Sequence, residues 1–327
     1  MARKRSVTLD IIRGISALLI VLFHYTAYYN KYPGNEPYQL DFAVTVDWGY
    51  AAVVTFFMLS GYLVAPALVK HSIAPAAYLT KKFKRFYPAY WVAMTVTSLV
   101  LLTMFAEQAV TIPQYFVNLT MVSPIFRVPF VDGVYWSMQY ELIFAVLCAL
   151  LLMVRRKALL VRLLFVWIIV AILLTVLPYK FLRFARLMFI SYHAYAFIGG
   201  IAIALFSMQI IKLKTLLYIS GLCVVSCVLN YGLMSPYMVF FAVTCVLLFV
   251  SERLDRYFTG NNLVIRMITW VAMISYPLYL LHQMVGYALL RNLHVIGFDT
   301  SWAILPVTGV VMVAAWMIHR FVEARIK

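Results

Sequence analysis

Apolar residues fill the chain in long runs, and polar residues are confined to short stretches between those runs. A run of about 20 apolar residues is long enough to cross the hydrocarbon core of a bilayer as an α-helix. The pattern predicts about ten such helices and leaves no segment long enough for a soluble domain. Their expected ranges are 9–28, 50–69, 86–106, 134–154, 159–177, 187–208, 214–231, 235–251, 269–290 and 301–319.

The composition agrees with a membrane protein. Hydrophobic residues make up 65% of the 327 residues and charged residues 12%, and a soluble protein cannot hide that much apolar surface. We therefore predict an all-α polytopic membrane protein in which residues 1–327 form a single integral membrane domain. The four cysteines fall inside apolar runs without neighbouring histidines or carboxylates, so no metal site is expected.

Lysine and arginine residues are unevenly divided between the two sides of these helices. If the N-terminus lies in the cytoplasm, only six of the 27 fall outside, namely Lys31, Arg127, Lys180, Arg183, Arg186 and Arg291. Cytoplasmic loops carry an excess of Lys and Arg, so both termini are expected in the cytoplasm. The same rule explains the net charge of +16 without any binding to nucleic acid.

Three outer segments stand out. The loops 29–48 and 107–133 are long and rich in Pro, Tyr and polar residues, which suits ordered re-entrant or lid-like segments. The segment Tyr179 to Arg186 is basic although it lies outside. It is a tolerated exception to the charge rule, an interfacial helix, or a contact for an anionic acceptor.

Arg13 and His24 are eleven residues apart in the first helix. At 100° per residue they lie about 20° apart on one face, separated by about 16 Å along the axis. Ionisable groups at such depth usually mark a pathway or a site. The alternatives are that Arg13 extends to the inner headgroups and that His24 is a hydrogen-bonded structural residue.

Other helices carry further polar candidates. Glu141 lies near the outer end of the fourth helix, and His282 lies near mid-membrane beyond the Pro277 kink, where a freed carbonyl is typical of membrane sites. Ser60 and Gly61 are small enough to allow close helix packing. The cations of Lys81–Arg85 stand before an apolar helix and suit either simple topology or the binding of phosphates at a helix N-terminus.

Five motifs, in order, resemble those of the acyltransferase 3 family of integral membrane acyltransferases. They are a basic residue and a histidine with ten residues between them (Arg13 and His24), "FFMLSGYL", "KKFKRFYPAYW" with Lys82 and Arg85 at its basic positions, "WSMQYE", and "SYPLYLLH". The resemblance covers nearly the whole chain. Lysines stand at 81, 82 and 84, where arginines are common, and a lysine lacks the planar fork of a guanidinium.

The resemblance implies O-acylation, most often acetylation, of surface glycans. The donor would be cytoplasmic acyl-CoA, a co-substrate rather than a tightly bound cofactor, and the acceptor an outward-facing glycan or lipid-linked saccharide. It implies the inner membrane of a bacterium as the location. Some relatives carry an added soluble domain. We expect none here, and we expect the protein to act alone or with a separate downstream transferase.

The resemblance also implies roles for individual residues. His24 is expected as general base, Glu141 as the group that orients His24 or the sugar, and His282 as a ligand of the acceptor or the oxyanion. Binding of the CoA phosphates is expected from Arg13, Lys82 and Arg85. The candidates for substrate binding within the motifs are Ser60, Tyr62, Trp136, Ser137 and Tyr276.

Two other classes of protein remain open on the residues alone. Buried histidine and glutamate also serve proton coupling in transporters and flippases, although the basic cytoplasmic mouth and the motif set favour the enzyme. A membrane scaffold without chemistry would leave the mid-membrane ionisable residues unexplained. A relay through a covalent acyl-enzyme also remains open.

Overall fold

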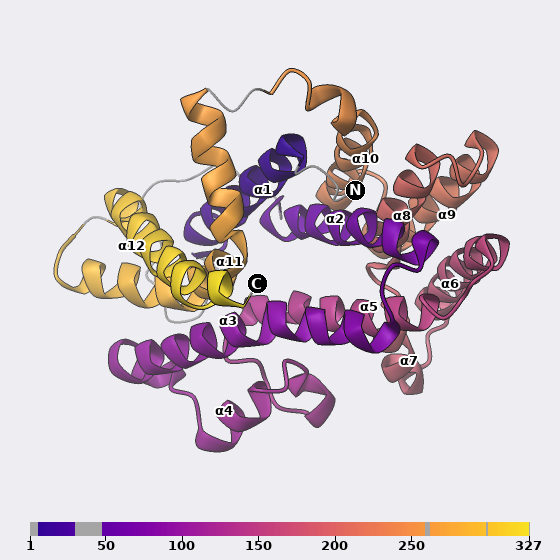
Figure 1. The fold of residues 1–327 in the computed structure, drawn as a ribbon. Coiled ribbons are helices and arrows are strands. Elements are labelled where there is room, and N and C mark those ends of the chain that lie inside the picture. Colours follow the sequence, from indigo (N-terminus) through magenta and orange to yellow (C-terminus); the bar gives the residue numbers. More distant parts are fainter. Residues whose placement is uncertain (1–5, 30–47, 259–261, 299, 327) are drawn as a thin grey trace. The chain divides into compact units, whose positions relative to one another are not determined.

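The computed structural model describes residues 6–29, 48–258, 262–298 and 300–326 (Figure 1). Within these ranges the chain is helical and no strand occurs. The helices are α1 (Val7–Tyr25), α2 (Trp48–Lys70), α3 (Pro75–Met104), α4 (Ile112–Asn118), α5 (Trp136–Leu151), α6 (Lys157–Val176), α7 (Arg183–Met188), α8 (Ala194–Ser207), α9 (Leu213–Tyr231), α10 (Pro236–Leu254), α11 (Leu263–Val295) and α12 (Thr300–Phe321).

Among the described residues, nine helices are long and apolar enough to cross a membrane, and α8 is a shorter apolar helix. The prediction of an all-α polytopic membrane protein is therefore confirmed. Short 3₁₀ helices lie between the longer ones, namely η2 (Ala106–Gln108), η3 (Ser123–Phe126), η4 (Gly133–Tyr135) and η5 (Lys180–Leu182), and η6 (Glu323–Arg325) follows α12.

The chain falls into two compact units, which we describe separately. Unit 1 holds Met1–Ser16, Tyr50–Lys81 and Tyr140–Ile265, and unit 2 holds Ala17–Gly49, Lys82–Gln139 and Arg266–Lys327. Several helices, α1 and α11 among them, contribute residues to both units. The expectation of a single domain over residues 1–327 stays a prediction.

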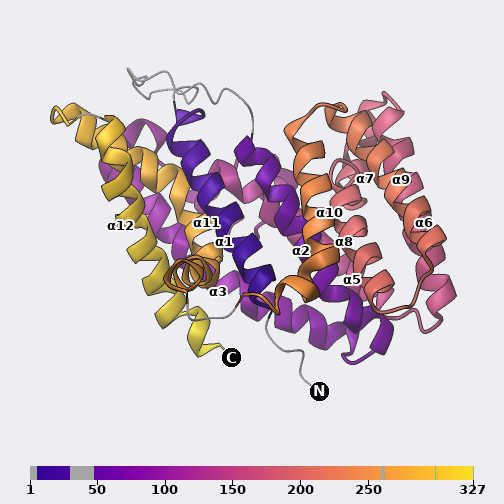
Figure 2. The same ribbon diagram turned by 90° about the horizontal axis from the view of Figure 1, so that it is seen from above.

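Unit 1 is built around α8, which is buried over most of its length and contacts α6, α9 and α10 (Figure 2). Glycines bring α2 against it. A Cβ atom at Gly61 would collide with the carbonyl of Phe197, and one at Gly200 would collide with the carbonyl of Met58. The expected close packing at Gly61 is thus confirmed, because only a residue without a side chain fits there.

The prediction of one helix over 187–208 was wrong, because the structure divides it into α7 and α8. Residues 189–193 form a turn, in which Ile190 has a positive φ of 53° and the Ser191 N–H donates to the carbonyl of Arg186. The Arg186 side chain donates to the carbonyls of Leu174 and Leu177. Bonds of this kind satisfy carbonyls at a helix end, so the basic segment caps the C-terminal end of α6.

Two helix boundaries also differ from expectation. Helix α3 begins at Pro75 rather than at residue 86, and α11 runs from Leu263 to Val295 rather than over 269–290. Lys and Arg are good helix formers, so the cationic stretch continues α3 instead of preceding it. The expected helix N-terminus near residue 86 is therefore wrong, so backbone N–H groups of a first turn are not available beside Lys82 and Arg85. Binding of phosphates by the side chains themselves stays a prediction.

In unit 2, the segment after α3 folds back along that helix. Three aromatic side chains of α3 donate to its carbonyls: Tyr87 to Thr120, Tyr90 to Asn118 and Trp91 to Leu119. The buried Asn118 side chain in turn bonds the carbonyl of Pro129 and the N–H of Val131. The expectation of an ordered segment over 107–133 is confirmed, whereas residues 30–47 of the other outer loop lie outside the described residues.

Candidate active site

Two histidines meet in the interior of unit 2. His24, next to the last residue of α1, has an exposed fraction of 2%, and His282, in the second half of α11, has one of 0%. The Nε2 atom of His282 lies 3.3 Å from the Nδ1 atom of His24, and the ring centroids are 4.8 Å apart. The structure thus brings together two of the three residues that the sequence predicted as catalytic.

Main-chain carbonyls define the tautomers of this pair. The Nδ1 atom of His24 lies 2.8 Å from the carbonyl oxygen of Ile20, and the Nδ1 atom of His282 lies 2.8 Å from that of Tyr279. A carbonyl oxygen only accepts hydrogen bonds, so both Nδ1 atoms carry the proton. In the neutral rings both Nε2 atoms then hold a lone pair, and that of His282 can accept from the Nδ1–H of His24.

The main chain around His282 is bonded to side chains from elsewhere in unit 2. Tyr25 donates through its hydroxyl to the carbonyl of His282 at 2.7 Å. Gly286, one turn further along α11, leaves the space for that phenol, because a Cβ atom there would overlap the hydroxyl of Tyr25. Tyr25 therefore holds the backbone of His282, and Gly286 leaves the space that this contact needs.

The segment that leads into α5 binds the same stretch of α11. Tyr135 donates to the carbonyl of Leu280, and Ser137 donates to the hydroxyl of Tyr279, which donates to the carbonyl of Val134. All of these side chains are buried. The two motifs "WSMQYE" and "SYPLYLLH" thus meet through hydrogen bonds beside His282.

Sequence reasoning did not identify Asp132, a buried residue whose side chain joins the segment before α5 to α11. Its carboxylate accepts the N–H of Val134 at 3.1 Å and that of Met284, in α11, at 3.0 Å. Burial raises the pKa of the Asp132 carboxyl from 3.8 to about 7, while the two N–H donors act in the opposite direction. Only the Asp-Gly pair before an apolar run hinted at a turn here.

Glu141 lies in unit 1, where Ser60 of α2 donates to its Oε1 at 2.5 Å. Glu141 is 6% exposed. A hydroxyl that donates to a carboxylate makes a strong, charge-assisted hydrogen bond. Ser60 is thus more than a small packing residue, since it fixes the orientation of the buried acid.

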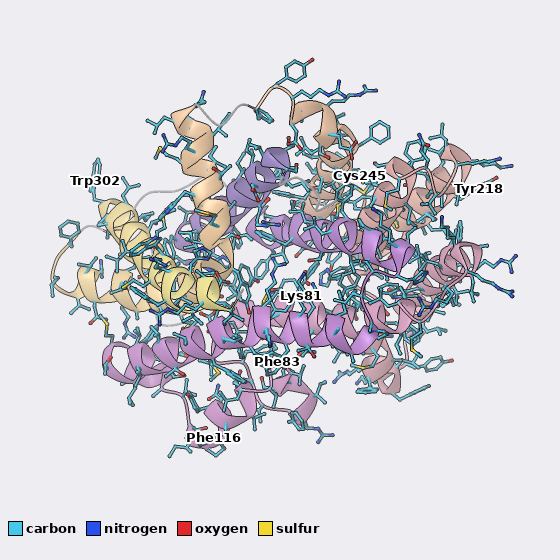
Figure 3. The ribbon with its side chains drawn as sticks, viewed as in Figure 1. Lys81, Phe83, Phe116, Tyr218, Cys245 and Trp302 are labelled. Atoms are coloured by element: carbon cyan, nitrogen blue, oxygen red, sulfur yellow. The ribbon has the colours of Figure 1, made fainter. Side chains whose placement is uncertain are left out.

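The three cations expected to bind CoA phosphates each contact a side chain close to them in sequence on the same helix. In unit 1, Arg13 is paired with Asp10 at 3.2 Å, one turn earlier on α1. In unit 2, the Lys82 ammonium lies 5.1 Å and the Arg85 guanidinium 5.7 Å from the centre of the Phe86 ring. Both residues belong to α3, as do Lys81 and Phe83, which Figure 3 labels.

Two of the remaining motif residues make hydrogen bonds within unit 2. Tyr276 donates to the carbonyl of Phe86 and joins α11 to α3, and Ser137 is engaged with Tyr279 as described. Tyr62 is buried, and Trp136 is partly buried at the first position of α5. Their roles in substrate binding stay predictions.

The arrangement provides a neutral imidazole pair in an apolar environment, which is suited to taking a proton from a hydroxyl. Among the described residues, no group of three or more His, Cys, Asp and Glu side chains is placed to hold a metal ion. In unit 2, this arrangement of His24 and His282 is chemically suited to acid–base catalysis. In unit 1, Ser60 and Glu141 form a hydrogen-bonded carboxylate centre.

Nearly the whole chain is similar to a known family of proteins. The family model described as an acyltransferase domain, of the acyltransferase 3 type, matches residues 7–320. The chain is 33% identical over 97 residues to "Protein 2 in picA locus" of Rhizobium radiobacter, a match that covers 28% of this chain and 44% of that protein. No solved structure matches the chain.

Proposed function

We propose that this chain, which belongs to the acyltransferase 3 family and is therefore a membrane acyltransferase, moves an acetyl group from acetyl-CoA to a glycan hydroxyl. The acceptor is an outward-facing glycan or a lipid-linked saccharide, and the location is the inner membrane of a bacterium. The observation that carries the proposal is the buried pair of His24 and His282, whose tautomers leave a lone pair on each Nε2 atom.

His24 is the general base in this proposal. Its Nε2 atom takes the proton of the acceptor hydroxyl as the hydroxyl oxygen attacks the thioester carbonyl carbon. The tetrahedral intermediate then collapses, the carbon–sulfur bond breaks, and the CoA sulfur leaves with the proton from His24. General acid–base catalysis of this kind contributes about 10²- to 10⁴-fold to the rate.

His282 supports His24 rather than standing apart from it. When Nε2 of His24 is protonated, its ring becomes an imidazolium, and the Nδ1–H can be donated to Nε2 of His282 at 3.3 Å. A hydrogen bond to the charged form favours that form. This geometry supports a charge-stabilising role for His282 more directly than the acceptor or oxyanion contact that the sequence suggested.

Glu141 orients the acceptor sugar, with Ser60 holding one of its carboxylate oxygens. Carboxylates accept two or more hydrogen bonds, so the carboxylate can also accept from a sugar hydroxyl. The charges of Arg13, Lys82 and Arg85 attract the phosphates of CoA on the cytoplasmic side. The partners of the enzyme are acyl-CoA, the saccharide, the lipid bilayer and, where the product is passed on, a separate downstream transferase.

Acetyl transfer by the purified full chain in lipid nanodiscs tests the proposal. We expect labelled acetyl to pass from acetyl-CoA to oligosaccharides from the envelope of the producing cell, and His24→Ala to reduce this rate by at least about 100-fold. Wild-type rates in His24→Ala would remove the general base. A protein that neither binds CoA nor transfers acetyl, yet couples saccharide flux to protons, would be a transporter.

A further inference from the structure

A cluster of aromatic residues surrounds a third buried histidine, His193, in unit 1. We define the His193 cluster as Phe57 of α2, Tyr140 of α5, His193 at the start of α8, Tyr231 at the end of α9 and Tyr237 of α10. Phe57 and Tyr140 belong to two of the motifs, but no motif includes His193, Tyr231 or Tyr237. The mechanism above gives none of the five a role. In the predicted orientation, the ends of α5, α8, α9 and α10 that carry the tyrosines and His193 lie on the outer side of the membrane.

Ring contacts hold His193 in place. Its centroid lies 4.9 Å from that of Tyr140 in an edge-on arrangement and 5.2 Å from that of Phe57. The Nδ1 atom of His193 lies 3.2 Å from the hydroxyl of Tyr231. The cluster thus combines apolar ring faces with a hydrogen-bonded polar pair.

The tyrosines of the cluster form its accessible side. The rings of Tyr231 and Tyr237 stack at 3.9 Å with an angle of 10° between their planes. Tyr140, Tyr231 and Tyr237 are half-buried, and the neighbouring Tyr192 is exposed. Interfacial tyrosines are common in membrane proteins, but here their rings stack on one another and pack around a buried histidine instead of facing lipid singly.

Two buried hydroxyls adjoin the cluster without a hydrogen-bond partner among the described residues, those of Ser191 and Ser226. Both residues have an exposed fraction of 0%. The Asn230 side chain, next to Tyr231, reaches the main-chain carbonyls of both serines. Buried polar groups are almost always hydrogen-bonded to protein or to ordered water, so each of these two hydroxyls can still take one more polar partner.

The cluster adjoins the carboxylate centre of unit 1 along two helices. Tyr140 directly precedes Glu141 in α5, and Phe57 lies one turn before Ser60 in α2. Phe57 and Ser60 share one face of α2, because they are three residues apart. The cluster is therefore close along both helices to the two residues that, in the proposed function, orient the acceptor sugar.

We propose that the His193 cluster binds one sugar ring of the acceptor saccharide and presents it to Glu141. A sugar offers apolar C–H faces that stack on aromatic rings and hydroxyls that bond to Tyr, His and Ser, and ligand sites combine these two kinds of contact. The inference rests on the proposed function, because it names the site for the saccharide that the enzyme acylates.

Hydrogen exchange on the full chain in lipid nanodiscs tests this site. The probes are oligosaccharide fragments released by mild acid from the envelope of the producing cell, and CoA alone. We expect the fragments, but not CoA, to slow amide exchange in peptides that cover residues 189–196 and 229–238. Tyr231→Phe removes one hydroxyl and retains the ring, so it should fold and raise the acceptor KM by about 5-fold, the loss of one hydrogen bond.

His193→Gln is a second variant with the same expected direction. Tyr218→Phe is the matched control, because Tyr218 lies on α9 at the edge of unit 1, is exposed and is remote from the cluster in sequence (Figure 3). The proposal is overturned if the fragments protect neither peptide, or if Tyr218→Phe raises the acceptor KM as much as Tyr231→Phe does.

The two proposals fail in different ways. If the fragments protect these peptides while acetyl-CoA yields no transfer, the sugar site stands and the donor chemistry is wrong. If acetyl is transferred while the peptides stay unprotected and Tyr231→Phe keeps the wild-type acceptor KM, the sugar site is wrong and the acyltransferase stands.

Discussion

The Nε2 atom of His282 faces the Nδ1 atom of His24 at 3.3 Å, although the two residues are 258 positions apart in the chain. Each Nδ1 atom also points at a main-chain carbonyl on its own helix. The two histidines therefore differ in their roles. The Nε2 lone pair of His282 faces His24, whereas the Nε2 lone pair of His24 takes no part in their contact.

Removal of His282 should weaken the base without abolishing it. We expect His282→Ala to lower kcat for acetyl transfer by about 10-fold, the loss of one hydrogen bond to a charged group, while KM for acetyl-CoA stays unchanged. His294→Gln, an exposed histidine on the same helix, serves as control. A kcat as low as that of His24→Ala would show that His282 itself exchanges protons with the substrate.

Glycine at 286 should be required for the position of Tyr25. We expect Gly286→Ala to destabilise the protein by about 1–3 kcal/mol, the usual cost of overpacking a core, because the added methyl group displaces the Tyr25 phenol. Thermal unfolding in detergent measures the change. The added Cβ would meet the ring atoms Cε1 and Cζ of Tyr25 as well as its hydroxyl. Tyr25→Ala removes all three atoms, so Gly286→Ala should lower the Tm less in a Tyr25→Ala background than in wild type. An equal loss of Tm in both backgrounds would indicate damage elsewhere.

Ser60 should act through Glu141. Ser60→Ala removes the donor to Oε1, and we expect it to raise the acceptor KM by about 5-fold, as for one charge-assisted hydrogen bond. Glu141→Gln should raise the acceptor KM further. In a Glu141→Gln background, Ser60→Ala should add little, because residues that act as a unit are not additive. Full additivity in steady-state kinetics would contradict the coupling.

Removal of each cation should affect the donor. We expect Arg13→Ala, Lys82→Ala and Arg85→Ala each to raise KM for acetyl-CoA several-fold with kcat nearly kept, which is the signature of lost ground-state binding. Arg156→Ala, on another predicted cytoplasmic loop, controls for a general loss of positive charge. An unchanged KM in all three variants would place the phosphates elsewhere.

The pH dependence of stability should report Asp132. Because its pKa is raised to about 7 in the folded protein from 3.8 in the unfolded chain, the folded state binds the proton more tightly between these values. The Asp132 contribution to stability is therefore fully present below about pH 4 and falls as pH rises towards 7.

Asp132→Asn removes this titration, so the Tm of wild type should fall relative to that of the variant between pH 4 and pH 7. The amide offers one oxygen for the two N–H donors, so the variant should also be less stable at low pH, by about 1–3 kcal/mol for a backbone donor left unpaired. Parallel Tm curves across this range would show that Asp132 does not titrate there.

Sequence patterns predicted most of the helices and the candidates for chemistry. Apolar runs are long because a bilayer requires them, so the segments were visible without any knowledge of packing. Helix ends were less visible. Nothing in the letters of "KKFKRF" distinguishes a cytoplasmic loop from the first turns of α3, and the turn at Ile190 lies inside an apolar run.

The identities of His24, Glu141 and His282 stood out because ionisable residues are rare in membrane helices. The residues that they contact did not stand out in the sequence. The contact of His24 with His282 and the hydrogen bond from Ser60 to Glu141 are contacts between helices, which no spacing in the sequence encodes. Asp132 and His193 lie just outside the regular helices, where polar residues are common and attract no notice.

The hydrogen bonds between residues 132–137 and the stretch 279–284 of α11 also determine when the site can form during synthesis. Ribosomes make about 5–20 residues each second, so His24 enters the membrane long before its partner exists. The nascent protein must hold α1 and α5 in the bilayer, without the imidazole pair, until α11 has been inserted. A truncated chain that ends before α11 would therefore be a membrane protein without a completed base.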